Sequence, residues 1–415
     1  MRIFILEIKR VMKTRSTWIL LILALLLTFL LAWIPTTFFY SSYTDDSGNL
    51  VELTGLDSIA YEKELQSEAA GTVTPEKVRE AVEIYQACLN HYGVEQSYDL
   101  PAGVYETEIL PYVPEIHGVK TLFADPVTGI EPPLMEIDPE KIDNYYQACE
   151  DQLSAQMVRE QGNNLSARNT AMNMYADVEK PFEVYPGFNS NALDYQTMLA
   201  FLIVLFCAVI AAPIFSAEYQ SGADDILRCT RRGKCYLAAV KILSALCISG
   251  IAFMICTVLY ILISNTLFGW ECTKTSIQMI YSILTLADMD LGQLQWFLAW
   301  TGLLCVLAVV SFTLFLSANF RSTVAALATA LLFCLMPLII SVIMPESISN
   351  WLCSILPAGG VGLQTSILYA VQDFKFFNIG NMAVWTPYAA VIAYIIEIPL
   401  FAGLTVYSYV RHTVR

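Results

Sequence analysis

Six long apolar runs restrict this chain more than any other feature of its sequence. A hydrocarbon core about 30 Å thick is crossed by about 20 helical residues, so each run is long enough to span a membrane. None of the runs alternates as barrel strands do, and backbone groups in lipid must bond to one another, so we expect helices. The sequence therefore predicts an all-α polytopic membrane protein with six transmembrane helices. The runs cover residues 17–39, 197–215, 236–263, 294–316, 323–344 and 385–410.

Lysine and arginine fall mainly on one side of these runs. Thirteen of the 23 lie before the first run, between the second and third runs or at the start of the third, between the fourth and fifth runs, or after the sixth. With six spans these places share one side of the membrane, and the positive-inside rule makes that side cytoplasmic. Both termini are therefore predicted to be cytoplasmic. The first run is longer than a signal-peptide core and no small-residue cleavage site follows it, so we expect an uncleaved helix over 17–39.

Residues 40–195, here named the acidic domain, separate the first two runs. They hold 28 Asp and Glu against 8 Lys and Arg, a net charge of −20, whereas the whole chain has −15. Such a surface excludes nucleic acid as a partner, because duplex binding needs positive charge. Cationic peptides and cations are compatible with it, and so is a role in solubility alone.

The acidic domain has helix signals of its own. A Thr-Pro pair at Thr74 predicts the start of a helix that ends at Gly93. Asp138 begins a second predicted helix, which runs to about Gly162. Residues 94–137 are rich in Pro and Tyr and are predicted as loops with a short strand or two. We expect a mainly helical extracytoplasmic domain that is large enough to bury its own core.

Motifs for catalysis or metal binding are missing from the sequence. No C-x-x-C pair, H-E-x-x-H, G-x-S-x-G or phosphate loop occurs, so we predict no metal site, no cofactor and no enzymatic activity in this chain. Cys88 and Cys149 are the two cysteines of the acidic domain, and both fall in predicted helices. A disulfide between them and two free thiols are both open at this point.

An amphipathic segment with much of the basic charge lies between the second and third apolar runs. At helical spacing its apolar face holds Phe215, Tyr219, Ala223, Ile226 and Leu227. The opposite face, which we expect to face water, holds Glu218, Ser221, Asp225, Arg228 and Arg232. This pattern predicts a cytoplasmic helix over 217–232. An ordinary basic loop is the alternative.

The order of residues in this segment resembles the coupling-helix motif of type-2 ABC permeases, a family of exporter-type membrane subunits. The matching series is Glu218, Gly222, Leu227, Arg228, Arg231, Arg232, Lys234 and Lys241. The sequence departs from the family at Ala223 and Thr230, where Thr and Pro are common, so the specificity of docking stays open. Residues 1–16 are similar to the interfacial elbow helix of the same family, with Glu7, Lys9, Arg10, Lys13 and Arg15 ahead of the first run.

The resemblance implies a permease subunit of an ATP-driven ABC exporter in the cell membrane of a bacterium. A separate ATPase subunit would bind ATP and Mg²⁺ and would contact Glu218, Tyr219, Gly222, Leu227, Arg228 and Arg232. A second permease copy or paralogue and membrane lipid are the other expected partners. The expected substrate is amphipathic, such as an antimicrobial peptide or a lipid, which links the chain to antimicrobial peptide resistance. A membrane sensory subunit that binds a ligand through the acidic domain is the alternative.

Two features lie in the last third of the five-helix region predicted over 196–415. Residues 345–384 hold a cluster of glycines after Pro357 in a moderately apolar stretch. A seventh span here would put the basic tail outside, so we expect a re-entrant segment or an outer-surface helical hairpin. Glu397 lies within the sixth run, where ionisable residues are costly. It is a functional candidate, or else a carboxylate hydrogen-bonded between helices or close to the outer boundary.

Overall fold

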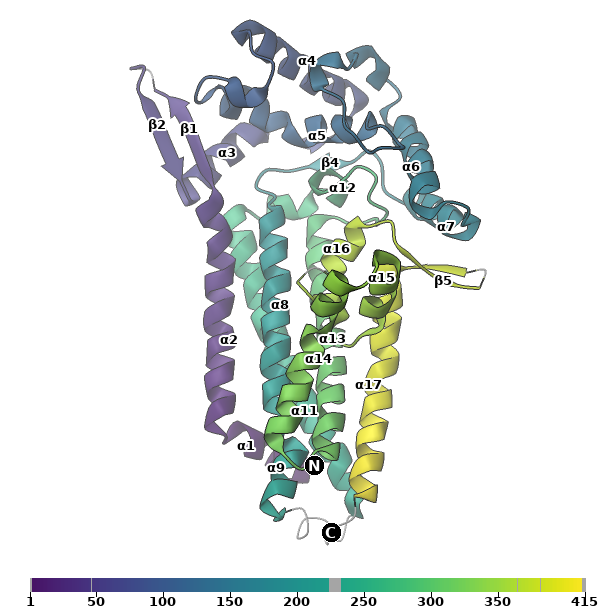
Figure 1. Cartoon of the computed structure of the whole chain (residues 1–415). Helices are drawn as coiled ribbons and strands as arrows, with labels where there is room; N and C mark the ends of the chain where they lie inside the picture. Colours follow the sequence, from purple (N-terminus) through teal and green to yellow (C-terminus); the bar gives the residue numbers. More distant parts are fainter. Residues whose placement is uncertain (1, 46, 224–232, 364, 381, 413–415) are drawn as a thin grey trace.

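The computed structural model describes residues 2–45, 47–223, 233–363, 365–380 and 382–412. Within that part of the chain, six helical segments are long and apolar enough to cross a membrane, so the six predicted spans are confirmed. They stand side by side as one bundle (Figure 1). The spans are α2 (Arg15–Trp33), α8 (Ser190–Ala211) continued by α9 (Pro213–Ser221), α11 (Gly233–Phe268), α13 (Leu291–Asn319), α14 (Thr323–Ile343) and α17 (Thr386–Arg411).

Several spans extend beyond the apolar runs that predict them. The second begins at Ser190, seven residues before the predicted 197, because the side chain of Asn189 caps it. The added turns contain polar residues that form hydrogen bonds inside the bundle. Gln196 donates to the Gln295 carbonyl oxygen over 2.9 Å, and the side-chain amides of Gln295 and Asn265 donate to each other over 2.8 and 2.9 Å. A prediction from hydropathy alone ends a span before such residues. They can lie inside the span because paired amides are stable when buried.

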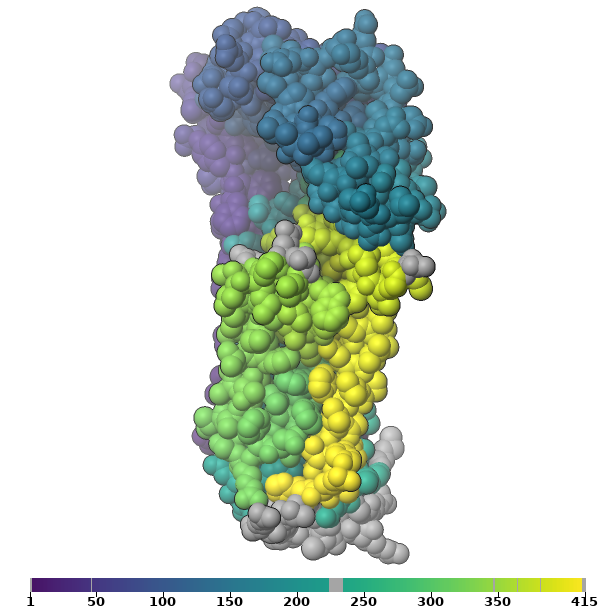
Figure 2. Space-filling view, turned by 45° about the vertical axis from the view of Figure 1, so that its right-hand side comes forward, coloured from purple at the N-terminus to yellow at the C-terminus, as the bar shows by residue number. Residues whose placement is uncertain are grey.

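Both ends of the described chain lie at the same end of the bundle. Helix α1 (Arg2–Met12) turns away from the base of α2, and α17 ends nearby (Figure 1). The acidic domain covers the opposite end, as the space-filling view also shows (Figure 2). The distribution of Lys and Arg predicts the same separation, with both chain ends on one side and the acidic domain on the other.

The acidic domain is mainly helical. The helix predicted from Thr74 to Gly93 is confirmed: the Thr74 hydroxyl accepts from the Lys77 N–H, and Gly93 ends the helix at a φ of +65°. Its helices are α3 (Leu56–Glu68), α4 (Pro75–Tyr92), α5 (Val113–Leu122), α6 (Tyr145–Gln161) and α7 (Leu165–Ala176). Two antiparallel pairs complete it, β1 (Tyr40–Thr44) with β2 (Leu50–Thr54) and β3 (Gly71–Thr72) with β4 (Glu183–Val184).

Two predictions for the acidic domain are wrong in detail. The helix expected from Asp138 begins at Tyr145, because a 3₁₀ turn over Pro139–Ile142 and a non-helical Asn144 come first. It ends before Gly162 as predicted. Residues 94–137, expected as loops with short strands, contain α5 and several single turns, and no strand is among the residues described there. The Pro and Tyr residues of this segment predict turns. The packing that extends one of these turns into α5 cannot be predicted from them.

The core of the acidic domain lies between α4, α5 and α6. Helix α6 buries Tyr145, Cys149, Leu153 and Met157, one residue per turn. Cys88 of α4 is also buried, and both cysteines are free thiols in the structure. Of the two alternatives that the sequence leaves open, this fold holds unbonded thiols.

The acidic domain rests on the loop between α11 and α13, which contains η7 (Glu271–Lys274) and α12 (Ile277–Ile280). The Tyr175 hydroxyl donates to the Ile283 carbonyl oxygen over 2.8 Å. The Glu179 N–H donates to Asp288 over 3.0 Å. These bonds fix the domain directly above the spans.

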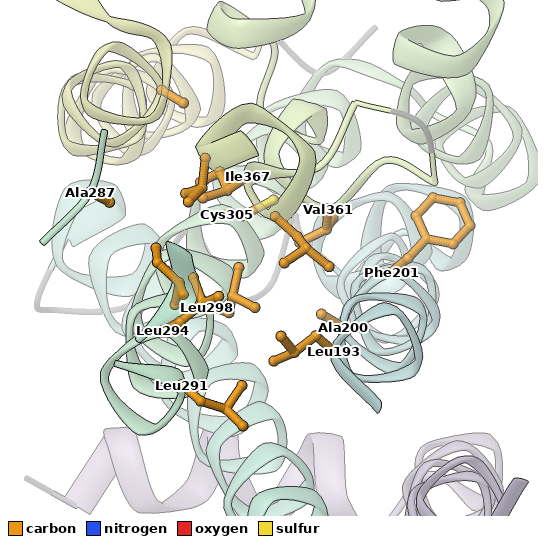
Figure 3. Close-up of a cluster of buried hydrophobic side chains, with 14 of the residues drawn as sticks. Leu193, Ala200, Phe201, Ala287, Leu291, Leu294, Leu298, Cys305, Val361 and Ile367 are labelled. Carbon is orange, nitrogen blue, oxygen red and sulfur yellow. The ribbon is translucent and has the colours of Figure 1, made fainter. Parts of the chain in front are cut away.

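Residues between α14 and α17 fold against the half of the bundle that is nearer to the acidic domain (Figure 1). They form α15 (Glu346–Ile355), η8 (Gly359–Val361), α16 (Ile367–Gln372) and a hairpin of β5 (Phe376–Ile379) and β6 (Met382–Trp385). The expected helical hairpin is therefore two short helices followed by a β-hairpin. Figure 3 shows Val361 and Ile367 among buried side chains of α8 and α13. The Cys305 thiol donates to the Pro357 carbonyl oxygen over 3.0 Å, so this turn reaches about 21 Å along α13, at 1.5 Å per residue.

Candidate coupling site

Helix α9 lies at the end of the bundle that also holds α1 (Figure 1). It continues α8 from Pro213, which has no N–H to donate to the preceding turn. The N–H groups of Phe215 and Ser216 donate instead to the Ser317 hydroxyl of α13, each over 3.0 Å. The Ser216 hydroxyl also lies 3.3 Å from that of Thr323 at the start of α14. These contacts join α9 to two neighbouring spans.

Glu218 of α9 is the centre of a group of charges in which Arg10 is half-buried and the other members are buried. Its side chain accepts hydrogen bonds from Arg10 of α1 and from Lys241 of α11. Arg10 also pairs with Glu7 over 2.8 Å. The group holds two positive and two negative charges, so its net charge is zero. We name these four residues the charge cluster.

The charge cluster corrects the predicted orientation of this segment. Glu218 was expected on the water-facing side, but its exposed fraction is 5% and that of Lys241 is 1%. A lone buried carboxylate is very costly, whereas one that is paired and hydrogen-bonded is tolerated. The spacing of residues within one helix assigns a glutamate to the water-facing side, because it contains no information about partners on other helices.

Aromatic rings connect α9 to the end of α17. The rings of Phe215 and Tyr409 are 5.2 Å apart, and Tyr219 stacks on His412 at 4.2 Å. The Lys241 ammonium lies 5.3 Å from the centre of the Phe215 ring, within cation–π range. With the charge cluster and the bonds to Ser317 and Thr323, α9 contacts α1, α11, α13, α14 and α17.

The predicted helix over 217–232 is not one continuous helix. Helix α9 ends at Ser221, and Gly222 adopts a φ of +70°, a left-handed conformation that commonly ends helices. Among the predicted contact residues, Glu218, Tyr219 and Gly222 therefore lie in or directly after α9. Leu227, Arg228 and Arg232 lie outside the described residues. Their role stays a prediction.

Sequence reasoning missed part of this site. The basic patterns of the sequence include Arg10 and Lys241 but do not identify them as partners of Glu218. A lysine inside the apolar run over 236–263 is a signal that could have suggested a buried partner. Ser317 and Tyr409 have no comparable signal, because a serine or tyrosine near a helix end is common.

Glu397 lies halfway along α17, about 17 Å from Thr386 at 1.5 Å per residue. It is therefore remote from both ends of this helix. One of its carboxylate oxygens is buried, and within the described part of the chain that oxygen has no hydrogen-bond partner. Its role stays a prediction. No cluster of His, Cys, Asp and Glu suited to a metal ion occurs among the residues described.

Comparison with known proteins identifies the family. The sequence model of one family, described as "ABC-2 family transporter protein", matches residues 1–387. A search of curated proteins found no match. The matched region includes α1, the acidic domain, α9 and five of the six spans. Members of this family are transmembrane components that are generally not enzymes and that work with an ABC ATPase. The chain therefore belongs to the ABC-2 transporter family and is a permease subunit of an ABC transporter.

Proposed function

We propose that this permease belongs to an ATP-driven exporter in a bacterial cell membrane. Two permease chains, either copies or paralogues, assemble with separate ATPase subunits that bind ATP and Mg²⁺. The chain ends and α9 face the cytoplasm, and the acidic domain faces outward. The distribution of Lys and Arg supports this orientation.

The contact pattern of α9 carries the proposal. A force applied to α9 from the cytoplasm is applied at once to the five helices that it contacts. The charge cluster resists rearrangement, because separating Glu218 from Lys241 leaves a buried charge without its partner. Movement of an ATPase against the segment after Gly222 would therefore shift whole spans as rigid bodies.

The proposed substrate is an amphipathic molecule such as an antimicrobial peptide or a lipid. Two observations support a substrate with positive charge. The acidic domain carries a net charge of −20 over the outer end of the bundle. Glu397 provides a carboxylate at mid-depth, and it is our candidate for a polar contact along the path between two permease chains.

Reconstitution with the cognate ATPase tests the proposal. The chain alone should hydrolyse no ATP, and ATP-dependent substrate efflux should appear only with the ATPase present. Glu218→Gln should reduce efflux per ATP hydrolysed by about tenfold or more. Leaving the Lys241 charge without its partner costs about 3 to 5 kcal/mol, and 1.4 kcal/mol already corresponds to a factor of ten in an equilibrium constant. Glu271→Gln is the matched control, since Glu271 is exposed on the outer loop. Undiminished efflux in Glu218→Gln would reject α9 as the transmission element.

A further inference from the structure

An apolar groove lies on the side of the bundle that would face lipid, where α1, α2 and α11 meet. Its volume is about 350 Å³. Its walls include Met12 of α1, Trp18, Leu21 and Leu25 of α2, and Ile251 and Ala252 of α11. The α2 residues lie about 5 to 15 Å from the start of that helix, at 1.5 Å per residue. The groove therefore lies in the half of the hydrocarbon core that is nearer to α1.

Unpaired positive charge lies at the α1 end of this groove. Lys9, Lys13 and Arg15 are exposed, and no ion pair of theirs occurs in the described part of the chain. Lys13 directly follows Met12 of the groove wall. Before position 45 the sequence has one acidic residue, Glu7, and that residue pairs with Arg10.

We propose that the groove binds an acyl chain of an anionic phospholipid from the leaflet on the α1 side. The phosphate of its headgroup would lie among Lys9, Lys13 and Arg15. The apolar walls alone cannot select a lipid, because the surrounding bilayer is as apolar as they are. Selection comes from the three cations, which attract an anionic headgroup at the membrane surface.

A second copy of the chain fits this groove less well. A two-fold contact would place the same patch of each chain against the other. Lys9, Lys13 and Arg15 would then face their own counterparts, and like charges repel. A phospholipid brings the opposite charge together with a chain that matches the apolar walls.

The groove is next to the coupling site. Ile8 and Met12 line the groove, while Glu7 and Arg10 of the same helix belong to the charge cluster. A bound lipid would hold α1 against the bundle from the side opposite Glu218. The binding itself does not depend on the direction or the substrate of transport.

Native mass spectrometry of the delipidated full chain in detergent tests the proposal. The probes are palmitoyl-oleoyl phosphatidylglycerol and the matching phosphatidylcholine. We expect the parent chain to retain phosphatidylglycerol about tenfold better. Lys9→Gln, Lys13→Gln and Arg15→Gln together should abolish that preference. Ala252→Trp, which fills the groove, should reduce retention of phosphatidylglycerol.

Matched controls separate the groove from the general surface. Leu26→Trp adds the same bulk at an α2 residue that is 61% exposed and outside the groove. Lys120→Gln, Lys141→Gln and Arg168→Gln remove three charges from the acidic domain. Both controls should bind lipid as the parent does. Equal retention of the two lipids by the parent chain, or an unchanged preference in the three-charge variant, would overturn the proposal. A parent chain that binds neither lipid, with loss of an oligomer in Ala252→Trp, would assign the groove to a second copy instead.

Discussion

The carboxylate of Glu218 can be buried because Arg10 and Lys241 neutralise its charge. Arg10 and Lys241 come from helices that are 208 and 23 residues away along the chain, so their contact depends on the assembled bundle. The position of Glu218 in the motif is enough to predict it as a coupling residue from the sequence alone. Its burial could not be predicted, because the periodicity of one helix contains no information about which other helix covers it.

Pairing at Glu218 predicts strong coupling between two substitutions. Glu218→Gln leaves the Lys241 ammonium buried without a carboxylate and should lower the free energy of unfolding by about 3 to 5 kcal/mol. Lys241→Met in the same chain should restore most of that loss. Thermal unfolding of the two single variants and the double variant in one detergent measures this coupling. Simple addition of the two single effects would show that the pair does not interact.

The two cysteines of the acidic domain give a second prediction at this scale. Burial raises the pKa of the Cys149 thiol to about 12, and burial with the Glu108 carboxylate raises the pKa of Cys88 to about 11. The thiolate is the reactive form, so the folded chain should resist alkylation at pH 8. After denaturation without reductant, mass spectrometry should find both residues alkylated. If alkylation requires prior reduction, the two thiols are bonded in the natural protein.

At the scale of helices and strands, length and caps predict most of the fold. The spans follow from apolar runs of about 20 residues, and α4 follows from Thr74 and Gly93. The short pairs β1–β2 and β5–β6 were not predicted. Strands of four or five residues have too little periodicity to be distinguished from loops, and their pairing depends on the elements against which they pack.

The turn between α15 and α16 depends on close approach at a glycine. A Cβ at Gly359 would lie 1.7 Å from the Cys353 carbonyl oxygen, so the backbone would have to move. Gly359→Ala should therefore destabilise the chain by at least about 1 to 3 kcal/mol, the usual range for a forced clash. Gly403→Ala is the control, because no atom lies within 4 Å of its added Cβ and alanine favours a helix. Equal melting temperatures for the two variants would argue against this packing of the turn.

At the scale of the whole molecule, the chain has two ends of different character. One end holds α1, α9 and the chain termini, and the other is covered by the acidic domain (Figure 1). The charge distribution predicts this polarity from sequence alone, because spans and basic residues can be counted without a structure. The way in which the acidic domain rests on the 269–290 loop could not be predicted, since it depends on contacts between residues about 100 positions apart.

Accessibility from outside the cell tests this polarity. In a cysteine-free background, a cysteine at Tyr98, which is 81% exposed in the acidic domain, should react with a membrane-impermeant maleimide in intact cells. A cysteine at Gln220, exposed at the end of α9, should react only after the cells are opened. Labelling of position 220 in intact cells would reverse the proposed orientation.

The central claim is that α9 receives the movement of an ATPase, and a contact measurement tests it most directly. A photo-reactive amino acid at Gln220 should cross-link to the ATPase subunit in cells, because this residue is exposed in the last turn of α9, two residues before Gly222. The same amino acid at Tyr98 is the control. We predict capture of the ATPase from position 220 and none from position 98. Absence of any ATPase cross-link at position 220, in cells where the ATPase co-purifies with the chain, would contradict the account.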